Sequence, residues 1–170
     1  LWQYPAVLLL ATLIVYGVAL SKSSRWIEPA GAAVGHDFIA FYMAGDMVHS
    51  GRAADLYNVR VQEKYQQDFM RDINPRWKGT CLYLNPPHYA WLLSWLSPLG
   101  YGPALLAWWA LSLTCFAAAA LLWRTWLDPN DWPLLTLLAA CMPAWFFALA
   151  GGQNSFFTLL ILAAFCHLLM

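Results

Sequence analysis

Residues Cys81–Trp123 read CLYLNPPHYAWLLSWLSPLGYGPALLAWWALSLTCFAAAALLW, and none of these 43 residues is Asp, Glu, Lys or Arg. Spanning the hydrocarbon core of a bilayer takes about 20 apolar residues in a helix. The stretch is therefore long enough for two membrane-spanning helices. Its segment Ser97–Pro103 contains two prolines and two glycines, a combination typical of a tight turn. We expect a short helix before this turn and a long helix after it.

A second uncharged run covers the last 39 residues, Trp132–Met170. The glycines and amides of Gly151–Asn154 divide it into two further apolar segments. The first twenty residues are also apolar. Together the pattern predicts an all-α, polytopic transmembrane helical bundle that forms one membrane domain over residues 1–170. Its spans are expected at about residues 1–20, 82–97, 103–123, 132–150 and 155–170.

The composition supports a membrane protein and excludes several other classes. Hydrophobic residues make up 61% of the chain and charged residues 11%, against about 45–50% and 25% in a typical soluble domain. Eleven tryptophans fit this class, because Trp gathers at membrane interfaces. Nine basic residues balance nine acidic ones, so no net charge favours nucleic acid as a partner. A soluble enzyme and a disordered chain are equally disfavoured.

Most of the charge lies in one polar segment, residues 21–80, with eight basic and seven acidic residues. Its apolar residues recur at helical spacing, which predicts helices at about 38–50 and 59–72. Asp37 stands at an N-cap position of the first helix and Gly51 at the position just past its end. Two amphipathic helices between membrane spans indicate a cap on the membrane surface.

The cysteines give no sign of a metal or redox site. No CxxC spacing occurs among Cys81, Cys115, Cys141 and Cys166. The last three lie in apolar runs, where cysteine acts as a small apolar side chain. We therefore expect no metal site and no cofactor.

Asp37 is the strongest candidate for chemistry. It lies in the segment GHDFIAFYMAG, residues 35–45, between aromatic residues and close to a membrane span. A carboxylate in a partly apolar site is a good general base. The alternative is that Asp37 only caps the helix that follows it. The two roles are compatible, and the pattern alone leaves both open.

Two other segments could bind a polar ligand. The double proline of Tyr83–His88 fixes the entrance of the predicted span, which places Asn85 and His88 at the mouth of the membrane. In the second segment the amides of Gln153 and Asn154 follow two glycines between apolar helices. An aromatic belt with a stiff helix start, and a plain surface loop, are the respective alternatives.

Together these motifs resemble a known family. The segment Asp-Phe-x-x-Phe-Tyr-x-Ala-Gly follows the first apolar helix, and Gly51, Leu56-Tyr57, Tyr83-x-x-Pro-Pro, Pro98 and Gly152-Gln153-Asn154 come after it in that order. The series resembles the bacterial polyprenyl-phosphate-dependent mannosyltransferases of glycosyltransferase family 87, in the GT-C superfamily. Family members are longer, so the resemblance implies that this chain is their amino-terminal part, which alone need not be active.

The resemblance implies a reaction. Such enzymes move a hexose, most often mannose, from a polyprenyl phosphate to a hydroxyl of a glycolipid or glycan acceptor, with inversion and without a nucleotide sugar. The acidic residue of the first extracytoplasmic loop, here Asp37, is the expected general base. The active face is extracytoplasmic, on the bacterial plasma membrane. The candidate substrate-binding residues are His36, Tyr42, Asn85, His88, Gln153 and Asn154.

Two points stay open at this stage. Lys22, Arg25, Arg52, Arg76 and Lys78 could each meet the phosphate, and nothing in their spacing selects one. The main alternative function is a transporter or flippase for a polar or lipid-linked solute, and a non-catalytic scaffold is the third. A transporter is expected to carry ionisable residues within its spans, and here only His88 and His167 are candidates, which favours the enzyme.

Overall fold

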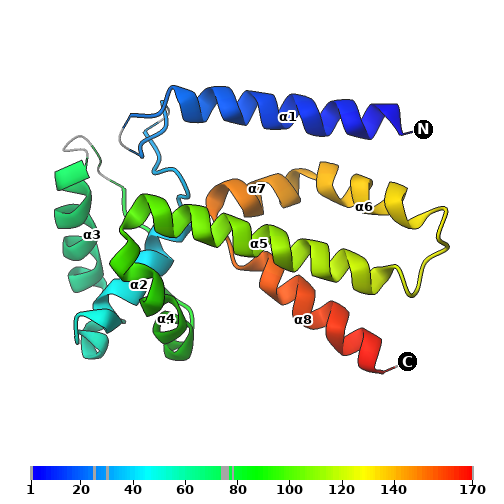
Figure 1. The fold of residues 1–170 in the computed structure, drawn as a ribbon. Helices are drawn as coiled ribbons and strands as arrows, with labels where there is room; N and C mark the ends of the chain where they lie inside the picture. The colour runs from blue at the N-terminus through cyan, green and yellow to red at the C-terminus, as the bar shows by residue number, and fades with distance from the viewer. Residues whose placement is uncertain (1, 25, 30, 74–76, 78, 170) are drawn as a thin grey trace. The chain divides into compact units, whose positions relative to one another are not determined.

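The structure is a computed structural model that describes residues 2–24, 26–29, 31–73, 77 and 79–169. Leu1 and Met170, the outermost residues of the first and last expected spans, lie outside the described residues. The described chain is built from helices and contains no strand, only two isolated bridges at Ser24–Ile27 and Ile27–Ala33. This confirms the predicted all-α class. The α-helices (Figure 1) are α1 Gln3–Ser21, α2 Phe38–His49, α3 Val59–Ile73, α4 Pro87–Leu93, α5 Tyr101–Trp123, α6 Trp132–Cys141, α7 Pro143–Gly151 and α8 Ser155–Leu168.

Two helices, α1 and α5, are long and apolar enough to cross a membrane. Their bounds match the expected helices at 1–20 and 103–123 closely, because bilayer thickness dictates both length and composition. The expected helix at 132–150 is instead the pair α6 and α7, bent by 61° at Met142. Pro143 causes the break, since proline cannot donate the hydrogen bond that would continue α6. The last helix, α8, has 14 residues.

The segment at residues 82–97 differs most from the expected span. Residues 79–84 have no helical structure, and Pro87 starts an α-helix of only seven residues. The chain then tightens into the 3₁₀ helix η2, Ser94–Leu99, which contains Pro98. Gly100, with φ of +76°, ends η2 in a conformation that favours glycine. Seven α-helical residues reach about 10 Å, far less than the hydrocarbon thickness of about 30 Å.

The chain divides into two compact units. Unit 1 comprises residues 1–18 and 108–170, and unit 2 comprises residues 19–107. In unit 1 the Trp108 ring stacks on Phe157 with centroids 5.1 Å apart, and its Nε1 donates to the Gly152 carbonyl at 2.8 Å. Cys115, Ala148 and Phe156 form its buried core.

In unit 2, α2 is the central helix. Phe38 to Gly45 and Met47 are all buried, so α2 is enclosed on every side and is not the amphipathic surface helix that we expected. A Cβ at Gly45 would lie 2.8 Å from the Leu93 backbone, so this glycine lets α2 approach α4 closely. Phe38, Tyr42, Phe69 and Tyr101 contribute neighbouring rings to the core.

The end of α2 confirms the prediction for Gly51. Gly51 has φ of +76°, and its N–H donates to the Val48 carbonyl at 3.1 Å. The N–H of Arg52 reaches the Met47 carbonyl at 2.7 Å. These two bonds form a Schellman motif, which satisfies carbonyls that the helix end would leave unpaired.

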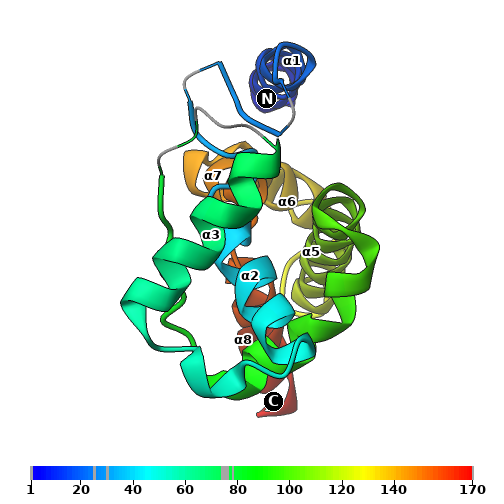
Figure 2. The same ribbon diagram turned by 90° about the vertical axis from the view of Figure 1, so that its left-hand side faces the viewer.

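The second predicted surface helix is confirmed as α3, an amphipathic helix that runs past α2 (Figure 2). Its most buried positions include two glutamines, Gln62 and Gln66. The Gln66 amide exchanges two hydrogen bonds with the backbone of Cys81, and the Gln62 amide does the same with Tyr83. Helix positions four apart are spaced like alternate residues of an extended chain. The two amides therefore hold the segment at 81–83 against α3.

Candidate functional site

Asp37 is the residue immediately before α2. Its backbone is already helical, with φ of −89° and ψ of −31°, and its side chain makes no capping hydrogen bond. An N-cap residue normally has extended dihedral angles that turn its side chain back toward the helix. Of the two roles that the sequence leaves open for the Asp37 side chain, capping is not found in this structure. The preceding Gly35, with φ of +71°, makes the turn into the helix.

The carboxylate of Asp37 lies beside two other functional groups. Its Oδ2 is 3.7 Å from Nε2 of His36, and the two side chains are 30% and 47% exposed. The Cys81 thiol is also near. Burial, and secondarily the charge of Asp37, raise the pKa of that thiol above its usual value. Since Gln66 holds the Cys81 backbone, α3 sets the distance between this extended segment and the start of α2.

An open hollow of about 160 Å³ lies next to Asp37. His36 and Cys81, the two neighbours of the carboxylate, both line it, together with Gly31, Ala32, Ala33, Ile39, Trp77, Gly79 and Thr80. The mixture of an imidazole, a hydroxyl, a thiol and an indole ring suits a ligand that has both polar and apolar faces. Asp37 itself is not among the described lining residues, but its two neighbours His36 and Cys81 are.

A second hollow of about 270 Å³ shares Gly31 and Trp77 with the first. Lys22, Ser24 and Glu28 supply its polar groups, and Ile27 and Pro29 complete it. Lys22 follows the last residue of α1, a helix of membrane length, so its ammonium group belongs at the level of the lipid headgroups. Among the basic residues considered for a phosphate, Arg25, Arg76 and Lys78 lie outside the described residues. Arg52 pairs with Asp55 at 3.7 Å.

Tyr42 and Asp46 belong to an internal polar cluster of unit 2. The Tyr42 hydroxyl donates to the Ser97 carbonyl at 3.1 Å, and the side chain is 4% exposed. Asp46 accepts hydrogen bonds from the hydroxyls of Tyr65, at 2.7 Å, and Ser97. Burial, then the charge of Asp46, and then Tyr65 raise the pKa of Tyr42 to about 12. Tyr42 is therefore a core residue that stays neutral.

Asn85 and His88 lie at the start of α4, where the predicted double-proline helix start is confirmed. Pro87 occupies the first turn, and Pro86 precedes it in an extended conformation. The Asn85 carbonyl accepts a hydrogen bond of 2.7 Å from the Tyr57 hydroxyl, and His88 is exposed. Neither residue is among those that line the hollow beside Asp37 in the described part of the chain.

Gln153 and Asn154 form the connection between α7 and α8, in unit 1 rather than unit 2. Gly152 is left-handed, with φ of +70°, and the Gln153 N–H donates to the Ala148 carbonyl at 2.8 Å. The Asn154 carbonyl accepts the Phe157 N–H at 3.1 Å, and the Gln153 side chain accepts from Ser155 Oγ at 3.3 Å. The two amides thus take part in a tight helix connection, and a ligand-binding role stays a prediction.

Sequence reasoning missed Trp77 and Asp46. Trp77 lies between Arg76 and Lys78 in the sequence, and its one signal is a large aromatic residue in a polar stretch. Asp46 is one of several carboxylates in the polar segment at 21–80, and nothing in the sequence sets it apart. Its hydroxyl partners come from α3 and η2, which no local pattern connects. Among the described residues, no group of three or more His, Cys, Asp or Glu is placed to hold a metal ion.

Comparison with known proteins adds one finding to this geometry. The sequence profile of glycosyltransferase family 87 matches residues 83–170, which is more than half of the chain. No curated protein and no solved structure matches it. The matched region contains α4, η2 and the apolar helices α5, α6, α7 and α8, and it begins after Asp37. The chain belongs to glycosyltransferase family 87, one of the membrane glycosyltransferase families of the GT-C type.

Proposed function

We propose that the protein transfers a hexose, most often mannose in the family it resembles, from a polyprenyl phosphate to an acceptor hydroxyl. Asp37 acts as the general base. The observation that carries this proposal is the position of Asp37. The carboxylate is partly exposed, is held at the start of a buried helix, and lies beside a hollow lined by its neighbours His36 and Cys81. The family match favours this reaction over transport.

The reaction makes one demand that this position meets. The acceptor oxygen forms a bond to the anomeric carbon while the bond from that carbon to the phosphate oxygen breaks. Attack from the opposite face inverts the centre. The acceptor proton passes to the Asp37 carboxylate, which must lie within hydrogen-bond reach of the hydroxyl. We propose that the acceptor hydroxyl enters through the hollow lined by His36 and Cys81 and reaches the carboxylate beside them.

The leaving group makes a second demand. Polyprenyl phosphate departs as a stable anion and needs no general acid, but positive charge or hydrogen-bond donors must hold it. We assign this role to Lys22, which lines the adjoining hollow at the end of α1. The isoprenoid tail then lies in the bilayer along the apolar helices. Glu28 in the same hollow limits how far the phosphate enters, because two anions repel.

Trp77 lies where the two hollows meet. Its indole ring packs against Gly79, where an added Cβ would lie 3.0 Å from the ring. An aromatic face between the phosphate and the base suits the apolar face of a hexose. We place the reaction on the extracytoplasmic face of a bacterial plasma membrane, as the family resemblance implies.

A donor experiment tests this proposal. The full-length enzyme is supplied with labelled polyprenyl-phosphate mannose, polyprenyl-phosphate glucose or GDP-mannose, in membranes that lack a polyprenyl-phosphate-mannose synthase. We expect labelled product from the mannose lipid. Transfer from the nucleotide sugar alone would overturn the lipid donor, and preference for the glucose lipid would overturn only the choice of sugar.

A further inference from the structure

The membrane boundary of unit 2 follows from the two long helices that border it. α1 ends at Ser21 and α5 begins at Tyr101, and both ends belong to unit 2. Both helices are long and apolar enough to cross the bilayer. Because one compact unit contains both ends, we place them on the same face of the bilayer. The residues between Ser21 and Tyr101 then contain no net crossing.

Contacts within unit 2 support this placement. The Tyr101 hydroxyl donates to the Val34 carbonyl at 2.6 Å. The rings of Trp26 and Phe38 lie at 6.1 and 5.8 Å from the Tyr101 ring, between centroids. The turn before α5 therefore packs against residues that directly follow α1. A segment at 82–97 that crossed the membrane would place this turn on the opposite face from Val34.

The helices α4 and η2 are buried on one side only. Ala90, Leu93, Ser94 and Ser97 are buried within unit 2. The other side exposes Trp91 at 60%, Leu92 at 54%, Trp95 at 74% and Leu99 at 50%. These four residues are named here the α4–η2 apolar face. No charged residue lies in this segment or in α5.

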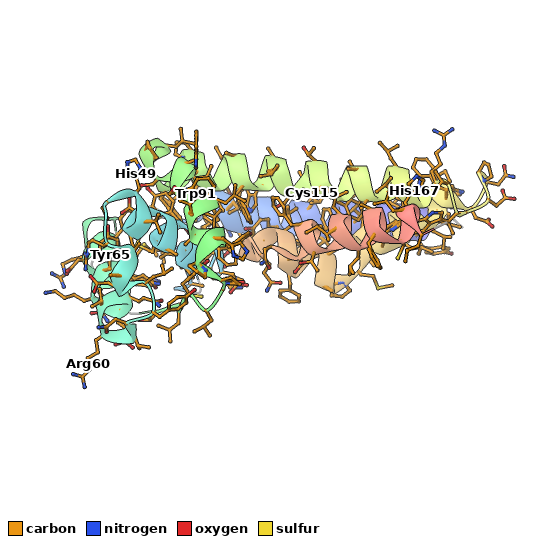
Figure 3. The ribbon with its side chains drawn as sticks, turned by 90° about the horizontal axis from the view of Figure 1, so that it is seen from below. His49, Arg60, Tyr65, Trp91, Cys115 and His167 are labelled. Atoms are coloured by element: carbon orange, nitrogen blue, oxygen red, sulfur yellow. The ribbon has the colours of Figure 1, made fainter. Side chains whose placement is uncertain are left out.

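The opposite character of α3 shows what a water-facing helix of this unit looks like. Its exposed positions include Arg60, Lys64, Gln67 and Asp68. Figure 3 shows the Arg60 side chain of α3 extending away from the unit. The same figure labels Trp91, which belongs to α4. Two exposed Trp and two exposed Leu on a charge-free segment fit the boundary between headgroups and acyl chains, where Trp is enriched.

We propose that the α4–η2 apolar face inserts into the lipid leaflet on the side of unit 2, and that residues 82–99 do not cross the membrane. The occupant of this face is the bilayer itself. Continuity with α5 carries this choice, because only Gly100 separates η2 from a helix of membrane length. The inserted face holds unit 2 at the depth where a lipid-linked ligand presents its headgroup. The inference does not depend on the role of Asp37.

Depth measurement tests the occupant. Single cysteines replace Trp95 or Gln67 in the full-length protein, with Cys81, Cys115, Cys141 and Cys166 replaced, and each carries a nitroxide in liposomes. Gln67 is the matched control because it is exposed on α3. We expect oxygen, which concentrates in lipid, to relax the label at 95 more than a water-soluble nickel chelate does, and the reverse at 67. A label at 95 that behaves like the one at 67 would overturn lipid contact. A label at 95 shielded from both agents would mean that protein covers this face, and would also overturn the proposal.

Topology provides the second measurement. Cysteines at Pro98, Gln67 and Asn130 are labelled with an impermeant reagent in sealed vesicles of one orientation. Pro98 is exposed but does not belong to the α4–η2 apolar face, and Asn130 is exposed in the connection beyond the other end of α5. Position 98 is expected to react on the same face as 67 and on the opposite face from 130. Reaction together with 130 would show that residues 82–97 cross the bilayer, and the proposal would fail whatever the transferase activity.

Discussion

Two carboxylates, Asp37 just before α2 and Asp46 within it, lie in opposite surroundings. Asp37 and Asp46 are nine residues apart, about two and a half helical turns, and so point to opposite sides of the helix. Asp37 is partly exposed beside a hollow, with an imidazole at 3.7 Å. Asp46 accepts hydrogen bonds from Tyr65 and Ser97 and joins α2 to α3 and η2. We infer that Asp37 is the carboxylate that a substrate can reach, whereas Asp46 stabilises the packing of α2 against α3 and η2.

The largest expected effect is on turnover, at Asp37. Asp37→Asn keeps the size of the side chain and removes the base, so transfer by the intact enzyme should fall by roughly 10²–10⁴-fold, the usual contribution of general base catalysis. Affinity for the lipid donor and the midpoint of thermal unfolding should remain close to wild type. Radiolabelled transfer and donor binding measure the two effects.

Asp55→Asn is the matched control for this variant. Asp55 is a carboxylate of the same unit that pairs with Arg52 at the surface, where an ion pair contributes about 0–1 kcal/mol. Its removal should leave transfer unchanged. Near-normal transfer by Asp37→Asn would end the assignment of Asp37 as the base and would direct attention to Asp46.

The next effect concerns the glutamine that positions the segment beside Asp37. Gln66→Met keeps the length of the side chain but leaves the Cys81 N–H and carbonyl without their partners. The free energy of unfolding should fall by about 1–3 kcal/mol, because unpaired buried backbone groups are costly. Transfer per folded molecule should fall as well, since Cys81 lines the hollow.

Gln67→Met provides the comparison for Gln66. Gln67 is the next residue on α3 and is exposed, so its substitution should change neither stability nor transfer. Thermal unfolding in detergent and transfer assays at equal folded protein separate the two variants. Equal behaviour of the two methionine variants would show that the paired amides do not position this segment.

How far the sequence predicts this molecule depends on the range of the interactions. The helices α1 and α5 follow from apolar length, and the end of α2 at Gly51 follows from the left-handed conformation that glycine favours. These features depend on residues close together in the chain. The extent of α4 was not predicted, because a short apolar segment reads the same whether it crosses a bilayer or packs on a buried helix.

The site shows the same limit. The motif that resembles the family directs attention to Asp37 and His36, and the structure adds Cys81 as a neighbour of the carboxylate. The hydrogen bonds between Gln66 and Cys81 join residues fifteen apart, and no periodicity in the sequence predicts them. The roles of Asp37, Asn85, His88, Gln153 and Asn154 in substrate binding or catalysis stay predictions.

Asp46 should affect stability and leave the chemistry intact. Asp46→Asn keeps one acceptor oxygen for two hydroxyl donors, and it loses the charge that strengthens both hydrogen bonds. The free energy of unfolding should fall by about 1–2 kcal/mol, since a hydrogen bond to a charged group contributes about 1.5–3 kcal/mol and one is partly retained. Transfer per folded molecule should match wild type.

The control for Asp46 is Asp68→Asn, which removes a carboxylate paired at 3.4 Å with Arg71 on the exposed side of α3. Its effect on stability should be small, as for other surface pairs. A loss of transfer by Asp46→Asn at full stability would contradict the comparison that opened this Discussion, because it would give the internal carboxylate a catalytic role.

The smallest effect is on the alkaline stability of unit 2. Burial, Asp46 and Tyr65 raise the pKa of Tyr42 from 10.0 to about 12 in the folded protein. Below pH 10 the hydroxyl is neutral in both states, so its contribution to stability is fully present. Between pH 10 and 12 the unfolded chain loses this proton while the folded chain keeps it, so the free energy of unfolding falls.

Tyr42→Phe removes this titration together with the hydrogen bond to the Ser97 carbonyl. At neutral pH the variant should be less stable by about 1 kcal/mol, the net contribution of one hydrogen bond. As the pH rises toward 12, wild type loses stability that the variant does not lose at this position, so the gap between them should narrow. Burial also raises the pKa values of Tyr65 and Tyr83. Both proteins therefore lose some stability at alkaline pH through these two residues. Thermal unfolding midpoints from pH 8 to 12 measure the gap. A constant difference across this range would show that Tyr42 ionises as easily in the folded protein as in the unfolded chain, and Asp46 would then lose its part in keeping the internal cluster neutral.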